Sequence, residues 1–188
     1  MTQRVRTHIR YYAATDATPV GRAALDYLKG LLRIAPVRVL SVTGGLQGPW
    51  ERFGTVLSTP IGPTFINVVC CDPARWTWIQ KIDMPNVVDG KVVSTEHAEQ
   101  RIELYTRGVR NVLLIASTEA RVEQAASALR YDAVVAIDHL VAAKIGATLQ
   151  LARVAYAMTH AAAKTPIVIR VPITDASGHE ALRQAVAP

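Results

Sequence analysis

Apolar runs of strand length alternate with segments of helical periodicity along most of this 188-residue chain. The run FINVVCC at 65–71 reads as a continuous apolar strand, which is typical of a central strand buried on both faces of a parallel sheet. Parallel strands need crossover connections, which are usually helices. We therefore expect an α/β fold, a Rossmann-like three-layer sandwich with a mostly parallel sheet, formed by a single domain over residues 1–188.

The same patterns predict the individual elements. Thr18 and Pro19 are the expected N-cap and first residue of a helix after the first strand, and Ser177 and Glu180 form a capping-box pattern for a last short helix. Residues 44–64 are rich in glycine and proline and are expected to form a long loop. Strands are predicted at 7–14, 37–43, 65–71, 111–117, 131–137 and 165–173, and further helices at 118–130 and 138–164.

Asp89-Gly90, between two pairs of valines, is the strongest hairpin signal in the chain. It predicts a small flap at 87–93. Ser94 or Thr95 is then expected to cap a helix that runs to about Arg107. Ala98, Ile102 and Tyr105 would share one face of that helix, and Gly108 would end it.

Charge and cysteine usage limit the classes of partner. The net charge of +6 and a pI near 9.6 suit an anionic partner. Nucleic acid is the least favoured, because the basic residues are scattered and no nucleic-acid-binding motif is present. Cys70 and Cys71 are expected to be buried thiols on opposite faces of a strand. We expect no metal site, no cofactor and no membrane span, and a cytoplasmic protein, because no signal peptide is recognised.

Ligands of open α/β sheets bind beyond the carboxyl ends of the strands, so the loops there are the places to search. Gly21, Gly44 and Gly45 would let the backbone approach a phosphate or a sugar closely. Helix N-termini in these loops could hold an anion, but ordinary N-capping is the favoured explanation for each of them. No GxGxxG fingerprint and no P-loop is present, so neither a dinucleotide site nor a P-loop site is predicted.

Asp72 and His139 follow two of the predicted strands, where catalytic acids and bases tend to occur in such sheets. A turn role for Asp72 and a surface position for His139 are the alternatives. Trp50, Trp76 and Trp78 fall in or beside the loops, where each could stack on a sugar or fill an interface.

The order of these parts resembles the N-terminal Rossmann-like half of GT-B glycosyltransferases. The resemblance covers about residues 7–140 and lies in PVGRAALDYLKGLLR, VRVLSVTGG, FINVVCCDP and NVLLIASTEARVEQA. It implies a cleft for a nucleotide-sugar or another anionic ligand. The residues that it would place around that cleft are Gly21, Gly44, Gly45, Ser117 and Glu119.

Two functions follow from the sequence. The resemblance implies a glycosyltransferase-like protein that handles a sugar or nucleotide-sugar. A GT-B enzyme has a second domain that holds most of the donor, for which 188 residues leave no room, so this chain would be incomplete as an enzyme on its own. The alternative is a non-catalytic structural or assembly subunit of a larger complex or particle, with a protein partner or further copies of itself.

Overall fold

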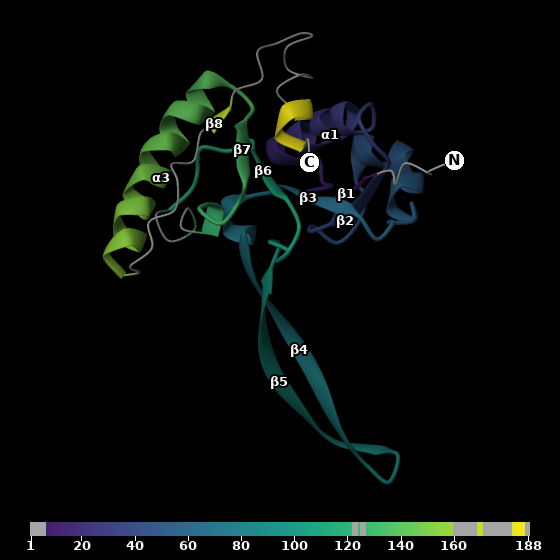
Figure 1. Cartoon of the computed structure of the whole chain (residues 1–188). Coiled ribbons are helices and arrows are strands. Elements are labelled where there is room, and N and C mark those ends of the chain that lie inside the picture. The colour runs from purple at the N-terminus through teal and green to yellow at the C-terminus, as the bar shows by residue number, and fades with distance from the viewer. Residues whose placement is uncertain (1–6, 122–123, 125–126, 160–168, 171–181, 187–188) are drawn as a thin grey trace.

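A parallel sheet forms the centre of the molecule in the computed structural model, which describes residues 7–121, 124, 127–159, 169–170 and 182–186 (Figure 1). Its strand order is β2-β1-β3-β6-β7-β8, and every neighbouring pair is parallel. The expected α/β fold with Rossmann-like topology is confirmed. The strands are β1 (His8–Ala13), β2 (Val37–Ser41), β3 (Phe65–Cys70), β6 (Asn111–Ile115), β7 (Ala133–Ala136) and β8 (Ile169–Arg170).

Helices α1 (Pro19–Leu31) and α3 (His139–Thr159) pack against this sheet. Helix α1 begins as predicted, since the Thr18 hydroxyl accepts a hydrogen bond from the Gly21 N–H at 3.1 Å. Helix α3 begins after Asp138, whose carboxylate accepts a hydrogen bond from the Val141 N–H at 2.7 Å. Both caps satisfy N–H groups that the first turn of a helix leaves unpaired.

Alternate residues of each strand supply two hydrophobic cores, one on each side of the sheet. Tyr11 and Cys70 pack with α1 in one core, while Cys71 packs with Ile145 of α3 in the other. The prediction that the two cysteines are buried on opposite faces is therefore confirmed. Burial raises the pKa of the Cys70 thiol to about 12 and also raises that of Cys71, so neither is a reactive thiolate near neutral pH.

A long antiparallel hairpin projects from the body of the molecule (Figure 1). It consists of β4 (Thr77–Val88) and β5 (Lys91–Glu103), joined at Asp89 and Gly90, both of which have positive φ. We call residues 77–103 the arm. The predicted hairpin turn is confirmed, but the hairpin is far longer than the expected flap at 87–93.

The helix predicted at 94–107 is wrong, because residues 91–103 form strand β5. The turn places Ser94 and Thr95 opposite Asn86 and Pro85, and pairing then continues to the base of the arm. A spacing of four residues, as between Ala98 and Ile102, fits one face of a strand as well as one face of a helix. The spacing from Ala98 to Ile102 therefore does not discriminate between the two structures, and Tyr105 lies beyond the end of β5.

Smaller differences concern the connections. The loop 44–64 contains a 3-10 helix, η1 (Gly48–Leu57), and a second 3-10 helix, η2 (Pro73–Arg75), leads into the arm. In the predicted helix 118–130, residues 118–121 are not helical, whereas 124, 127 and 128 are. Ser177 and Glu180 lie outside the described residues, and residues 182–186 after them are helical.

Candidate functional site

The loops predicted to bind a ligand lie at the carboxyl edge of the sheet. The chain passes from β1 to β2 on one side and reaches β3 on the other side of β1, so the strand order reverses at β1. Doubly wound sheets bind ligands at this kind of reversal. The loops after β1, β2 and β3 therefore form the first place to look for a site.

A cluster of hydroxyl groups ties the loop after β1 to the loop after β2. The buried Thr15 hydroxyl lies 2.6 Å from the Ser41 hydroxyl and donates to the Gly45 carbonyl at 2.5 Å. Thr43 accepts a hydrogen bond from the Thr15 N–H at 3.0 Å, and Ser41 accepts one from the Gly45 N–H at 3.1 Å. These hydroxyls bond one another, so they fix the shape of the edge and hold Gly45 in place.

Gly21 is buried beneath the loop after β1. A β-carbon at this position would lie far closer to the Asp16 carbonyl oxygen than the 3.0 Å that real β-carbons respect. The Gly21 carbonyl accepts a hydrogen bond from the Trp50 indole at 2.9 Å. Gly21 therefore allows the loop to fold tightly onto α1, and the structure places backbone rather than open space beside it.

Gly44 is exposed at the tip of the loop after β2 and has a φ of +89°, in the region that favours glycine. A β-carbon added at Gly44 or Gly45 would meet no atom within 4 Å. The two residues thus present open backbone at the carboxyl edge. They lie beside the hydroxyl cluster, whereas Gly21 is enclosed.

The two candidate catalytic residues lie on the same edge but not side by side. Asp72 follows β3 and is half-buried, and His139 is exposed at the first position of α3, after β7. Because β6 separates β3 from β7, the two positions are roughly 10 Å apart by strand spacing alone. A reacting group would have to lie between them for both to act on it.

The loop after β6 lies between Asp72 and His139. The Ser117 hydroxyl accepts a hydrogen bond from the Glu119 N–H at 3.1 Å, and the Glu119 side chain is exposed. Arg75, just after Asp72, donates from its guanidinium to the Val42 carbonyl and so crosses the end of β1. From Asp72 to His139 the edge therefore carries the Asp72 and Glu119 carboxylates, the Ser117 hydroxyl and the His139 imidazole, with the Arg75 guanidinium anchored beside them.

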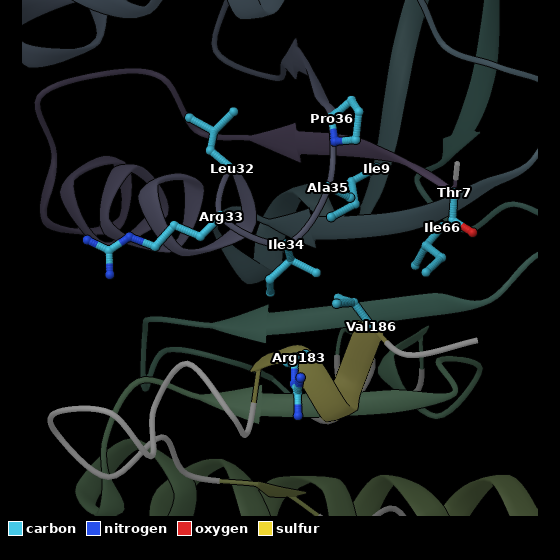
Figure 2. A pocket seen from close by; sticks show the side chains of 10 residues that line it. All are labelled: Thr7, Ile9, Leu32, Arg33, Ile34, Ala35, Pro36, Ile66, Arg183 and Val186. Atoms are coloured by element: carbon cyan, nitrogen blue, oxygen red, sulfur yellow. The ribbon is translucent and has the colours of Figure 1, made fainter. Parts of the chain in front are cut away.

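Two cavities of the described residues lie away from this edge. Figure 2 shows one of about 690 Å³ at the opposite, amino edge of the sheet, near Pro36 and Thr7, which precede β2 and β1. Another of about 680 Å³ lies between α1 and η1. Neither is lined by a predicted site residue.

Trp50 and Trp76 are buried, so neither can stack on a ligand. The Trp76 indole donates a hydrogen bond to the Cys71 carbonyl at 3.3 Å. Trp78 lies in β4, not in a loop. The interpretation of Trp50 and Trp76 as residues that contact a sugar is therefore wrong, and both are parts of the core.

The arm is a structural element whose size the sequence did not reveal. At its tip Val87, Val88, Val92 and Val93 are each 52–62% exposed. At its base, Asn67 of β3 donates a hydrogen bond to the Leu104 carbonyl at 2.6 Å and another to Asn111 at 2.8 Å. A buried asparagine in an apolar strand needs hydrogen-bond partners. The asparagines at 67 and 111 were therefore the sequence signal that another segment of the chain is hydrogen-bonded to these strands.

Comparison with protein-family models, with curated proteins and with solved structures finds no match to this chain. Within the ranges that the structure describes, no group of histidine, cysteine or acidic residues is placed to hold a metal ion. No helix in that part of the chain has the length and apolar character needed to cross a membrane.

Proposed function

We propose that this chain binds a sugar-containing anionic ligand of the nucleotide-sugar class at the carboxyl edge of its sheet, as one half of a glycosyltransferase-like site. The reversal of strand order at β1 carries this proposal, because it brings the loops after β1, β2 and β3 to the position where doubly wound sheets bind ligands. Open backbone at Gly44 and Gly45 would approach the phosphates, and the net charge of +6 favours an anion.

Asp72 and Glu119 would accept hydrogen bonds from the sugar hydroxyls, and Ser117 would contact the phosphate or the sugar. Asp72 or His139 would act as the acid or base if the site catalyses a transfer. Gly21 has a supporting role, because it lets the loop after β1 fold onto α1. In the enzymes that the sequence resembles, a second domain holds most of the nucleotide-sugar, so this chain is proposed to bind the remaining part of that ligand.

Thermal unfolding with a panel of nucleotide-sugars tests this function. A ligand present at about 100 times its dissociation constant adds about 2.7 kcal/mol to the free energy of unfolding. We expect at least one member of the panel to raise the midpoint, and Asp72→Asn to reduce that rise. Asp26→Asn is the matched control, since Asp26 is an exposed residue of α1 paired with Lys29.

A panel without any effect on the wild-type midpoint would contradict the proposed ligand. An equal response of wild type and Asp72→Asn would remove Asp72 from the site.

A second function, assembly with other protein chains, is favoured by the arm. A two-stranded hairpin is only marginally stable in water when it is isolated. The four exposed valines at its tip form the kind of apolar surface that marks an interaction site. We propose that the arm docks on another chain and that the sheet serves as its platform.

Replacing the four tip valines together by threonine should lower the assembly state of the protein. Threonine keeps the β-branched shape, so the hairpin can persist while its apolar surface is lost. Light scattering after size exclusion measures the mass, and circular dichroism checks the fold. A wild type that is monomeric at every concentration, or a threonine variant that assembles equally, would contradict this function.

A further inference from the structure

The cavity at the amino edge of the sheet combines apolar walls with positive charge. Its volume of about 690 Å³ lies in the range of about 300–1,000 Å³ that is usual for ligand pockets. Figure 2 shows Leu32 and Ile34, just after α1, on one side of it and Val186 on the other. In the part of the chain that the structure describes, the charged residues of its lining are Arg33 and Arg183, and both are exposed. The cavity therefore suits an apolar body that carries a negative charge.

The tip of the arm has these properties. Val87 and Val92 lie directly opposite each other in the ladder, so their side chains share one face of the hairpin. Residues 85–95 are all exposed, and their charged members are Asp89 and Lys91. Asp89 lies in the turn itself, ahead of Lys91, which begins β5. The tip is thus an apolar projection with a carboxylate at its end.

The tip lies far from the cavity of its own chain. Trp76 and Leu104, which flank the arm, belong to the core on one side of the sheet, whereas Ile66 and Val186 at the cavity belong to the core on the other side. The arm is roughly 40 Å long, given its twelve-residue strand. Figure 1 shows it projecting away from α1 and from the helical residues near the C-terminus. The tip can therefore meet this kind of cavity only on another molecule.

Two unlike surfaces on opposite sides of one chain favour head-to-tail contacts. A contact between unlike surfaces leaves one tip and one cavity unused, so it repeats from copy to copy and forms a ring or a filament. Each contact would cover the four tip valines, which are otherwise an exposed apolar patch.

We propose that the arm tip of one copy of this chain inserts into the amino-edge cavity of the next copy, head to tail. The tip valines pack there against Leu32 and Ile34, and the Asp89 carboxylate pairs with the guanidinium groups of Arg33 and Arg183. The docking site rests on the assembly function proposed above, to which it adds a second copy of the chain as the partner.

Complementation between two variants tests the docking site. The tip variant carries the four valine-to-threonine changes, and the cavity variant carries Leu32→Glu and Ile34→Glu. In light scattering, the wild-type mass should rise with concentration beyond twice the 20.4 kDa of one chain, and each variant alone should keep the mass of one chain. An equal mixture should give a complex of two chains and nothing larger, because the intact tip of one variant enters the intact cavity of the other and no second contact can form.

Leu140→Glu is the matched control for the cavity variant. Leu140 is 62% exposed, against 40% for Leu32, and lies in the first turn of α3 at the opposite edge of the sheet. This control should assemble as wild type does. If circular dichroism shows that the cavity variant fails to fold, Leu32→Glu alone replaces it and should raise the dissociation constant of the assembly at least tenfold.

Asp89→Asn tests the charge pairing by itself. Asparagine before glycine favours the same hairpin turn, so the arm should persist without the carboxylate. We expect the dissociation constant to rise about two- to fivefold at low ionic strength, and the difference from wild type to vanish at high salt. Equal affinities of wild type and Asp89→Asn at low ionic strength would overturn the pairing with the arginines.

Three results would overturn the docking site: a cavity variant that assembles as wild type does, a mixture of folded variants that stays monomeric, or a wild type that stops at one or two chains. A monomeric wild type that binds cis-parinaric acid, a fluorescent fatty acid, with binding lost in the cavity variant, would overturn it too, because a small amphiphile would then be the occupant.

The two proposals can fail separately. If the tip variant loses assembly while the cavity variant assembles as wild type does, the arm acts in assembly but docks elsewhere. In that case the amino-edge cavity is not the docking site, and the assembly function stands.

Discussion

Replacing Gly21 by alanine should lower the free energy of unfolding by about 3 kcal/mol, at the upper end of what overpacking costs. The new β-carbon would clash with the Asp16 carbonyl oxygen and with the Asp16 carboxylate. Because the nearer atom belongs to the backbone, the loop after β1 would have to move, and the Thr18 cap with it. Intrinsic helix propensity alone would instead make the alanine variant more stable by about 1 kcal/mol. The expected change in the free energy of unfolding therefore has the opposite sign to the change that propensity predicts.

Gly54→Ala provides the matched control for this prediction. Gly54 lies in η1, has no positive φ, and a β-carbon there would meet no atom within 4 Å. Its effect on the free energy of unfolding should stay within about 0.5 kcal/mol, as for most surface changes. Chemical denaturation of the two variants measures the difference. A Gly21→Ala variant as stable as Gly54→Ala would show that the loop does not press on α1.

The role of Gly21 also shows which part of the site could be predicted from sequence. Thr18 and Pro19 were predicted correctly because an N-cap and a first-turn proline act within four residues. The tight fold of the Asp16 loop depends on Thr15, whose partners lie 26 to 30 residues away. Local patterns do not encode a loop shape that a distant strand determines.

Trp50 illustrates the same limit. It lies among the glycines and prolines of 44–64, which is typical of an exposed loop, yet its indole reaches the Gly21 carbonyl, 29 residues away. The sheet itself was predictable, because its central strands are apolar on both faces, as β6 is. The positions of Asp72, Ser117 and His139 beyond strand ends followed from the same strand predictions, while their distances from one another did not.

The length of the arm could not be predicted because its two strands pair with each other, and a local pattern does not show how far such pairing runs along the chain. The Asp89-Gly90 turn gave its centre, since positive φ at both positions is a local property. Beyond the turn, the four-residue spacing of apolar residues fits a strand and a helix alike. Only the pairing of β5 with β4 distinguishes the two structures.

Asn111→Ala should lower the free energy of unfolding by about 3 kcal/mol and loosen the base of the arm. The buried Asn111 side chain makes four hydrogen bonds of 2.8 Å. It accepts from Asn67 and from the Thr106 N–H, and it donates to the Thr106 and Val109 carbonyls. Alanine would remove all four bonds and leave the Asn67 side-chain amide, the Thr106 N–H and the two carbonyls without those partners.

Asn86→Ala, at an exposed position on the arm, is the matched control and should change stability by less than about 0.5 kcal/mol. Hydrogen exchange separates the local effect from the global one: the amide of Thr106, which donates to Asn111, should exchange faster in Asn111→Ala than the loss of global stability alone explains. Equal protection at Thr106 would mean that other contacts hold the segment from Leu104 to Val109. Because this segment joins the arm to β6, its rigidity sets the direction in which the arm leaves the sheet, and a loosened base should weaken any partner contact that requires a fixed direction.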